Sequence, residues 1–136
     1  IDPWQIYFSA SHATTEYTAI SSPDVQYLLG TAPQYTARDR ANLWTRYSFQ
    51  GGDSLGFWVG AGFNYTGKKA QISNNPWLYL PAQTVFDAVV GYDWKTAGNR
   101  WSAKLTWKNL TDEDELQTVR ERGQPARIIA DITVRF

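Results

Sequence analysis

Hydrophobic and polar residues alternate in short runs along most of the chain, which is the period of a β-strand and not that of a helix. Six runs show this alternation. Their apolar positions are Trp4, Ile6, Phe8 and Ala10; Ala41, Leu43, Tyr47 and Phe49; Leu55, Phe57, Val59, Ala61, Phe63 and Tyr65; Phe86, Ala88, Val90, Tyr92 and Trp94; Trp101, Ala103, Leu105 and Trp107; and Ile128, Ala130, Ile132, Val134 and Phe136. The positions between them are polar or small almost throughout. We therefore expect six strands, each with one apolar and one polar face, and no helix.

Two kinds of connection alternate between these runs. Residues 50–53 and 96–99 are short and contain glycine, which is typical of tight hairpin turns. The segments 13–36, 67–83 and 110–125 are long and rich in Pro, Asn, Asp, Ser and Thr. Up-and-down strands would place the tight turns at one end of a sheet and the long loops at the other. That asymmetry is typical of outer-membrane barrels, whose short turns face the periplasm and whose long loops face the exterior.

Aromatic side chains on the apolar faces gather near the two ends of the predicted strands. Those near the tight turns are Trp4, Tyr47, Phe49, Phe57, Tyr92, Trp94, Trp101 and Phe136, and those near the long loops are Phe63, Tyr65, Phe86 and Trp107. Aliphatic residues lie between the two groups. Aromatic rings favour the membrane–water boundary, and strands of about ten residues tilted by ~45° span a bilayer. The pattern predicts strands that cross an outer membrane.

Charge and composition exclude several classes of function. The 136 residues carry 13 basic and 13 acidic side chains, so no net charge draws the chain to nucleic acid. The absence of Cys excludes thiolate metal sites, and His12, the single histidine, argues against a multi-histidine metal site or a catalytic triad. We expect no enzyme, no catalytic residue, no bound metal and no nucleic-acid partner. The alternating charges Arg127, Asp131 and Arg135 are expected to pair with other charges of the polar face.

Five stretches of the sequence carry a resemblance to a known family. They are RANLWTRYSF, LGFWVGAGFNYTGKK, LPAQTVFDAVVGYDW, WSAKLTWKNLTDED and QPARIIADITVRF. Together they resemble the carboxy-terminal end of TonB-dependent outer-membrane receptors, and the likeness to receptors for ferric siderophores is closest. It covers nearly the whole chain. The more specific pieces are the strand at 85–92, the sequence KNLTD at 108–112 and the aromatic last residue.

The resemblance implies an all-β fold, namely a segment of an antiparallel up-and-down transmembrane β-barrel with about 22 strands in all. Residues 1–136 would supply about six of them as the carboxy-terminal portion, with the plug domain, the TonB box and the other strands absent from this chain. The implied location is the outer membrane of a Gram-negative bacterium. The implied partners are outer-membrane lipid, TonB, the barrel-assembly machinery and a small iron chelate. The ferric siderophore would be a transported ligand, and no cofactor is implied.

Candidate functional residues fall in the long loops and at the last strand. Trp77 and Tyr79 could face a siderophore, although an aromatic belt or the packing of the loop base explains them more simply. Arg120 and Arg122 could attract an anionic iron complex, although a solvated charged loop also explains them. By resemblance, Phe136 together with Val134 and Ile132 forms the signal that the barrel-assembly machinery recognises.

Two other functions remain open at this point. Alternation alone also fits a small soluble β-barrel that binds an apolar ligand, in the manner of lipocalins. A passive porin or a structural outer-membrane barrel would show the same belts and loops. The preferred reading is part of an active transporter that imports ferric siderophores with energy transduced by TonB.

Overall fold

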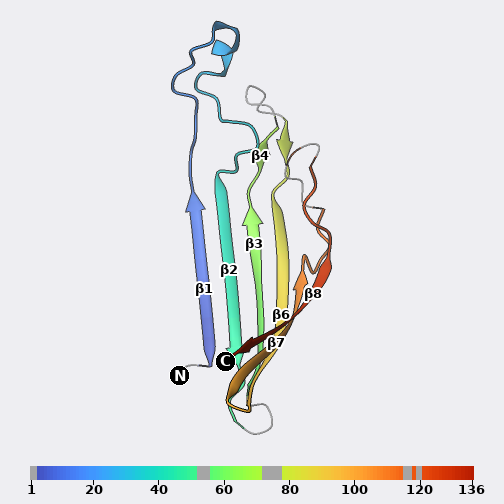
Figure 1. Cartoon of the computed structure of the whole chain (residues 1–136). Helices are drawn as coiled ribbons and strands as arrows, with labels where there is room; N and C mark the ends of the chain where they lie inside the picture. The colour runs from blue at the N-terminus through green and yellow to red at the C-terminus, as the bar shows by residue number, and fades with distance from the viewer. Residues whose placement is uncertain (1–2, 52–55, 72–77, 115–117, 119–120) are drawn as a thin grey trace.

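The computed structural model describes residues 3–51, 56–71, 78–114, 118 and 121–136. Within these ranges six strands form one antiparallel sheet in the order β1-β2-β3-β6-β7-β8 (Figure 1). The strands are β1 (Trp4–His12), β2 (Asp39–Ser48), β3 (Phe57–Thr66), β6 (Gln83–Thr96), β7 (Asn99–Lys108) and β8 (Arg127–Arg135). The six strands lie in the sheet in the order in which they occur along the chain, and β4 and β5, between β3 and β6, pair separately. This is the up-and-down arrangement that the sequence predicts. No helix in the described ranges is long and apolar enough to cross a membrane.

The register brings the apolar positions of all six strands onto one face of the sheet. One row across the sheet consists of Trp4, Tyr47, Val59, Val90, Leu105 and Ala130, each opposite the next. This confirms the faces predicted from the alternation, because side chains opposite one another on neighbouring strands project to the same side. Ile6, Phe8 and Ile132 on that face are exposed by 61%, 67% and 74%. Large apolar side chains that are this exposed are typical of a surface that contacts lipid and not water.

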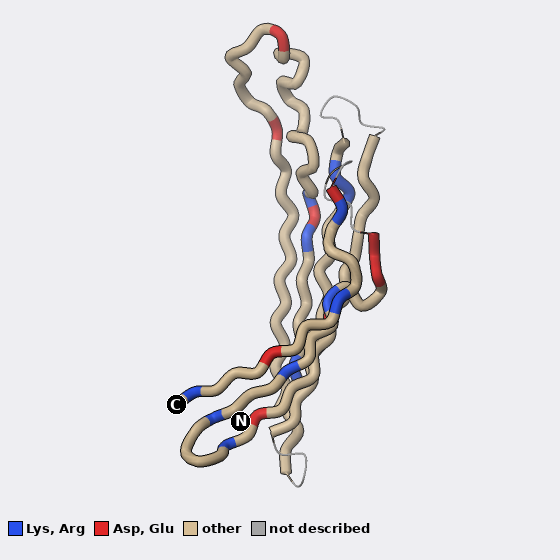
Figure 2. Tube along the Cα trace, turned by 45° about the vertical axis from the view of Figure 1, so that its right-hand side comes forward, with Lys and Arg blue, Asp and Glu red and all other residues tan. Residues whose placement is uncertain are grey.

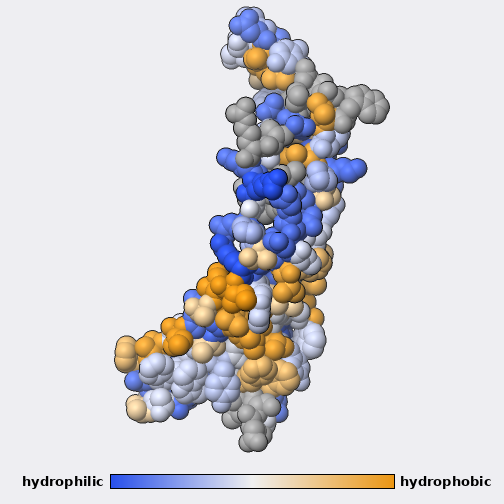
Figure 3. Space-filling model, turned by 90° about the vertical axis from the view of Figure 1, so that its right-hand side faces the viewer, coloured by the Kyte–Doolittle hydropathy of each residue, from blue (hydrophilic) through white to orange (hydrophobic). Residues whose placement is uncertain are grey.

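Aromatic rings on the apolar face contact one another near the tight turns. Trp4, Tyr47, Phe49 and Phe57 form a chain with neighbouring ring centroids 5.0–5.3 Å apart. The rings of Tyr92, Trp94 and Trp101 stack at centroid distances of 5.8 and 5.9 Å. Towards the long loops, Phe63 and Phe86 are 6.1 Å apart. In Figure 3 the hydrophobic residues gather in the lower half of the face shown, and hydrophilic residues cover the part nearer the long loops.

The turn predicted at 96–99 is a two-residue hairpin loop. Thr96 pairs with Asn99, and the residues between them, Ala97 and Gly98, have φ angles of +50° and +83°. Two consecutive positive φ angles are those of a type I′ turn, whose twist matches that of paired strands. The other predicted turn, 50–53, lies partly outside the described residues, with Gly51 at φ +91° on its described side.

Three features of the long connections and their borders were not predicted from the sequence. The segment 13–36 contains a short 3₁₀ helix, η1 (Pro23–Leu28), which begins at a proline whose fixed φ suits the first helical turn. In the segment 67–83, β4 (Lys69–Ala70) pairs with β5 (Tyr79–Leu80). β6 also begins three residues before Phe86, because Gln83 and Thr84 continue the pairing with β3 although neither is apolar. Alternation cannot detect such polar or two-residue strands.

Candidate functional site

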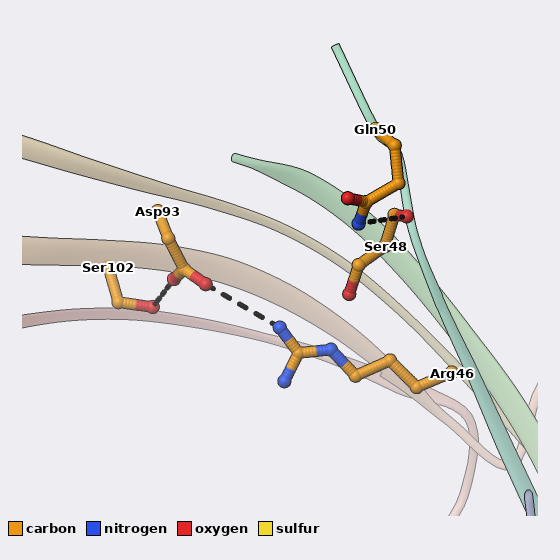
Figure 4. Close-up of polar contacts among 5 residues, drawn as sticks. All are labelled: Arg46, Ser48, Gln50, Asp93 and Ser102. Atoms are coloured by element: carbon orange, nitrogen blue, oxygen red, sulfur yellow. Dashed lines mark hydrogen bonds and ion pairs between the residues drawn. The ribbon is translucent and has the colours of Figure 1, made fainter. Parts of the chain in front are cut away.

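A polar cluster lies on the polar face, near the tight turns, and draws on three strands (Figure 4). Arg46 of β2 reaches across β3, and its Nη2 lies 3.5 Å from Oδ2 of Asp93 on β6. Ser102 of β7 donates a hydrogen bond of 2.6 Å to the other carboxylate oxygen, Oδ1. Beside the cluster, the Gln50 side chain donates to the backbone carbonyl of Ser48 at 3.3 Å. The cluster ties the end of β2 to β6 and β7 across the face.

Two indole rings occupy space on the polar face that glycines leave free. The guanidinium carbon of Arg46 lies 4.0 Å from the centroid of the Trp58 ring, within the range of a cation–π interaction. A Cβ on Gly91 would collide with that ring. Trp44 covers Gly62 in the same way. The sequence alone does not predict this packing of indole rings over glycines. The reason is that the fit depends on which residues lie opposite one another on neighbouring strands.

The charges of β8 pair only in part as expected. Lys104 of β7 lies opposite Asp131, and the two form an ion pair of 3.6 Å. Arg127 and Arg135 instead lie opposite Lys108 and Arg100, which are also cations. Within the described part of the chain no acidic side chain forms an ion pair with either arginine. The expectation is confirmed for Asp131, and for Arg127 and Arg135 no such pair forms among the described residues.

A second polar cluster fixes the base of the connection between β7 and β8. The Nζ of Lys108 lies 2.7 Å from Oδ2 of Asp87, whose side chain is only 9% exposed. Oδ1 of the same carboxylate accepts a hydrogen bond of 3.0 Å from the backbone N–H of Asn109. The carboxylate thus has a partner on each oxygen, as burial of a charge requires.

The side chain of Asn109 joins the two ends of this connection by hydrogen bonds. Its Nδ2 donates to the carbonyl oxygens of Glu113 and Gln124 at 2.9 and 3.1 Å, and its Oδ1 accepts from the N–H of Glu113 at 2.8 Å. Its φ of +51° is a left-handed conformation that Asn tolerates better than most residues. Asp112 adds a hydrogen bond of 2.8 Å from the N–H of Ala126. Both residues belong to the sequence KNLTD, which carries the family resemblance without revealing this role.

The residues predicted to bind a ligand are only partly described. Tyr79 lies in β5 opposite Ala70 and is about half exposed. Arg122 is well exposed and forms an ion pair of 3.3 Å with Asp114. Trp77 and Arg120 lie outside the described residues. Within the described ranges no hydrogen bond or ion pair joins Tyr79 to Arg122, so the ligand site stays a prediction.

The predicted assembly residues lie at the end of the sheet. Val134 and Ile132 pair with Trp101 and Ala103 on the apolar face. Phe136 follows β8 directly and is 99% exposed. Among the described residues, no group of three or more His, Cys, Asp or Glu side chains is placed to hold a metal ion.

Comparison with known proteins gives concordant results. Residues 1–110 match the family described as TonB dependent receptor-like, beta-barrel. Two ferrioxamine B receptors of Salmonella typhimurium, from strains SL1344 and LT2, are each 36% identical over 94 residues, which is 68% of this chain and 13% of the receptor. The chain thus spans only a small part of the relatives that it matches.

A solved structure shares the fold. The crystal structure of BauA, the ferric preacinetobactin receptor from Acinetobacter baumannii, superposes with a TM-score of 0.77 at 17% identity, over 97% of this chain and 20% of that receptor. The family match covers most of the chain, and the sheet has the up-and-down order and single apolar face of a membrane barrel wall. The chain belongs to the family of TonB-dependent receptor β-barrels.

Proposed function

We propose that this chain forms part of the wall of an outer-membrane transporter that binds ferric siderophores at the cell surface and imports them with energy transduced by TonB. The family match and the ferrioxamine B receptor relatives support this proposal. The observation that carries it is the alignment of six apolar strand faces in one register with aromatic rings towards both ends. That surface suits a bilayer with two interfaces.

In this arrangement the two faces have different roles. The apolar face contacts outer-membrane lipid, and the polar face lines the interior of the barrel. The hairpin at Ala97 and Gly98 faces the periplasm, and the connections that contain η1, β4 and β5 face the exterior. The other strands, the plug domain and the TonB-binding segment would belong to the complete receptor outside residues 1–136.

Ligand capture is proposed for the outer loops. Tyr79 offers an exposed aromatic ring beside the β4–β5 pair, and Trp77 lies two positions before it in the sequence. Arg122 offers a cation for an anionic iron complex, as does Arg120 in the sequence. Because Arg122 already pairs with Asp114, an incoming anion would have to compete with that carboxylate. Because the Arg122–Asp114 ion pair is exposed to water and therefore weak, breaking it costs little free energy.

Uptake of iron by the complete receptor tests the proposal. An iron-starved strain lacking its own siderophore receptors would express the receptor and be supplied with radioactive ferric hydroxamate chelates. We expect uptake that stops when a protonophore removes the inner-membrane energy supply. Uptake that persists without energy would favour a passive porin. A receptor that dissolves in water without detergent would favour the lipocalin-like alternative.

Assembly at the last strand needs a separate experiment. We propose that Phe136, with Val134 and Ile132, is read by the barrel-assembly machinery. Phe136→Ser and deletion of Phe136 should each lower the amount of heat-modifiable, folded receptor in isolated outer membranes. Phe136→Trp keeps an interfacial ring and should be mild. If the Ser and deletion variants assemble like the parent, the residue has no role in assembly.

A further inference from the structure

The ladder between β2 and β3 continues past the end of β3. The N–H of Gly67 donates to the carbonyl oxygen of Asp39 at 2.8 Å, and Ala37 then pairs in antiparallel fashion with Lys69, the first residue of β4. Figure 2 shows acidic and basic residues together where β2 begins, and basic residues beside them at β4. Charged side chains are costly in lipid. In the proposed arrangement this extension of the ladder therefore lies outside the bilayer.

The segment 35–37 acts as a third strand beside the β4–β5 pair. The N–H of Tyr35 donates to the carbonyl oxygen of Ala70 at 2.8 Å, and Ala70 pairs on its other side with Tyr79 of β5. Two strands of two residues each are at best marginally stable in water, and a third strand adds the pairing that such a hairpin lacks. We call the segment 35–37, β4 and β5 the outer sheet.

One face of the outer sheet is buried and the other is open. Ala37, Lys69 and Leu80 form a row across it and are exposed by only 6%, 7% and 5%. Tyr79 precedes Leu80 in β5, so it projects to the opposite side, and it is 49% exposed. Because the side-chain period of a strand is two, a shift of β5 by one residue would bury Tyr79 and expose Leu80. The register of β5 therefore determines whether the ring of Tyr79 is available to a ligand.

The backbone of Tyr35 is held in a conformation that an aromatic residue rarely adopts. Its φ is +59°, in the left-handed region, and its side chain is half-buried. Such a backbone is unfavourable for a bulky L-residue and persists only where the surrounding contacts hold it. In this conformation the N–H of Tyr35 reaches the carbonyl oxygen of Ala70.

We propose that the segment 35–37 positions Tyr79 for contact with the ferric chelate, and that Tyr35 is the positioning residue. The inference rests on the proposed function, because it needs an outer ligand site that includes Tyr79. The segment acts through the register of the outer sheet and not by touching the ligand. The connection between β1 and β2, in which the sequence predicts no ligand contact, thereby affects how tightly the ligand is bound.

Ligand binding by the purified full-length receptor in detergent tests this role. Tyr79→Ala removes one aromatic contact and should weaken binding of a radioactive ferric hydroxamate chelate by roughly threefold to tenfold. Tyr35→Pro removes the donor N–H and prevents a positive φ, so it should weaken binding by a similar factor. Tyr35→Gly keeps both features and should bind as the parent does.

The double variant separates positioning from a general loss of stability. If Tyr35 acts through Tyr79, Tyr35→Pro should have no further effect on binding once Tyr79→Ala is present. Additive losses, unchanged binding by Tyr35→Pro, or an equal loss with Tyr35→Gly would overturn the inference. The heat-modifiable band reports folding, and Tyr35→Val, which keeps the N–H but resists a positive φ, replaces the Pro variant if that one does not fold.

A spin label tests the outer sheet without any ligand. A nitroxide on a single cysteine, Tyr79→Cys, should become more mobile when Tyr35→Pro is added and should keep its mobility with Tyr35→Gly. An unchanged spectrum in the Pro variant would overturn the positioning role. If the parent receptor binds none of the chelates, the proposed function fails, and the spectra still show whether the segment 35–37 holds β5.

Discussion

The carboxylate of Asp87 lies 2.7 Å from the ammonium of Lys108, at the point where the sheet ends and the connection between β7 and β8 begins. Asp87 is nearly buried, whereas Lys108 keeps 44% of its side chain exposed. The same carboxylate accepts the backbone N–H of Asn109. Through this contact β6 holds Asn109, the first residue of the connection between β7 and β8. The same connection contains Arg122.

Removing the Asp87 carboxylate should destabilise the folded receptor more than removing an exposed carboxylate. Asp87→Ala leaves the buried N–H of Asn109 without an acceptor, so we expect a loss of about 1–3 kcal/mol in the free energy of unfolding. The matched control is Asp131→Ala, whose pair with Lys104 is about half exposed and should contribute about 0–1 kcal/mol. Urea unfolding in detergent, followed by the heat-modifiable band, compares the two. Equal midpoints would mean that the Asp87 cluster is not structural.

The side chain of Asn109 should determine how firmly the connection 110–126 is held. Asn109→Gly keeps the left-handed backbone but loses three hydrogen bonds, and Asn109→Ala adds backbone strain to that loss. Limited trypsin digestion of receptor in outer membranes should cleave after Arg122 fastest in the Ala variant, then in the Gly variant, then in the parent. Cleavage at the parent rate in the Gly variant would show that the side chain holds nothing in place.

Gly91 should resist substitution because of Trp58. A methyl group in Gly91→Ala meets the indole ring, and we expect a cost of about 1–3 kcal/mol in the free energy of unfolding. When Trp58→Leu is combined with it, the Ala substitution should cost clearly less, so the two changes should be non-additive. A double-mutant cycle by urea unfolding measures the difference. Strict additivity would contradict the packing seen here.

The two faces of the sheet should differ in their response to a buried charge. Val90→Arg puts a cation on the apolar face near mid-strand, and we expect a cost of about 2–4 kcal/mol. Thr106→Arg puts the same cation on the polar face and should be tolerated far better. The folded yield after refolding into lipid vesicles compares them, and similar yields would count against contact between the apolar face and lipid.

The alternation of residue types was sufficient to predict six strands, their apolar faces and one tight turn. The reason is that each strand faces two different environments, which a period of two records directly in the sequence. The register then follows from aligning the apolar faces and the turn, as the row from Trp4 to Ala130 shows. Two-residue strands such as β4 and β5 are too short to show any period.

The polar contacts could not be predicted in the same way. Arg46 meets Asp93 across an intervening strand, so no spacing along the chain reveals the pair. Asn109 acts through a left-handed backbone and through hydrogen bonds to residues 4 and 15 positions away. The sequence KNLTD singled the residue out by resemblance, but its role depends on the folded loop. The hydrogen bond from Tyr35 to Ala70 likewise joins two connections that no spacing along the chain relates.

Cysteine labelling in intact cells tests most directly whether these strands cross the outer membrane as proposed. Residues 1–136 contain no cysteine, so single cysteines can be placed at Asp24, exposed in η1, and at Ala97, exposed in the hairpin, of the full-length receptor. A membrane-impermeant maleimide should label Asp24→Cys in intact cells and Ala97→Cys only after the outer membrane is permeabilised. Labelling of Ala97→Cys in intact cells at the rate of Asp24→Cys, or faster, would contradict the account.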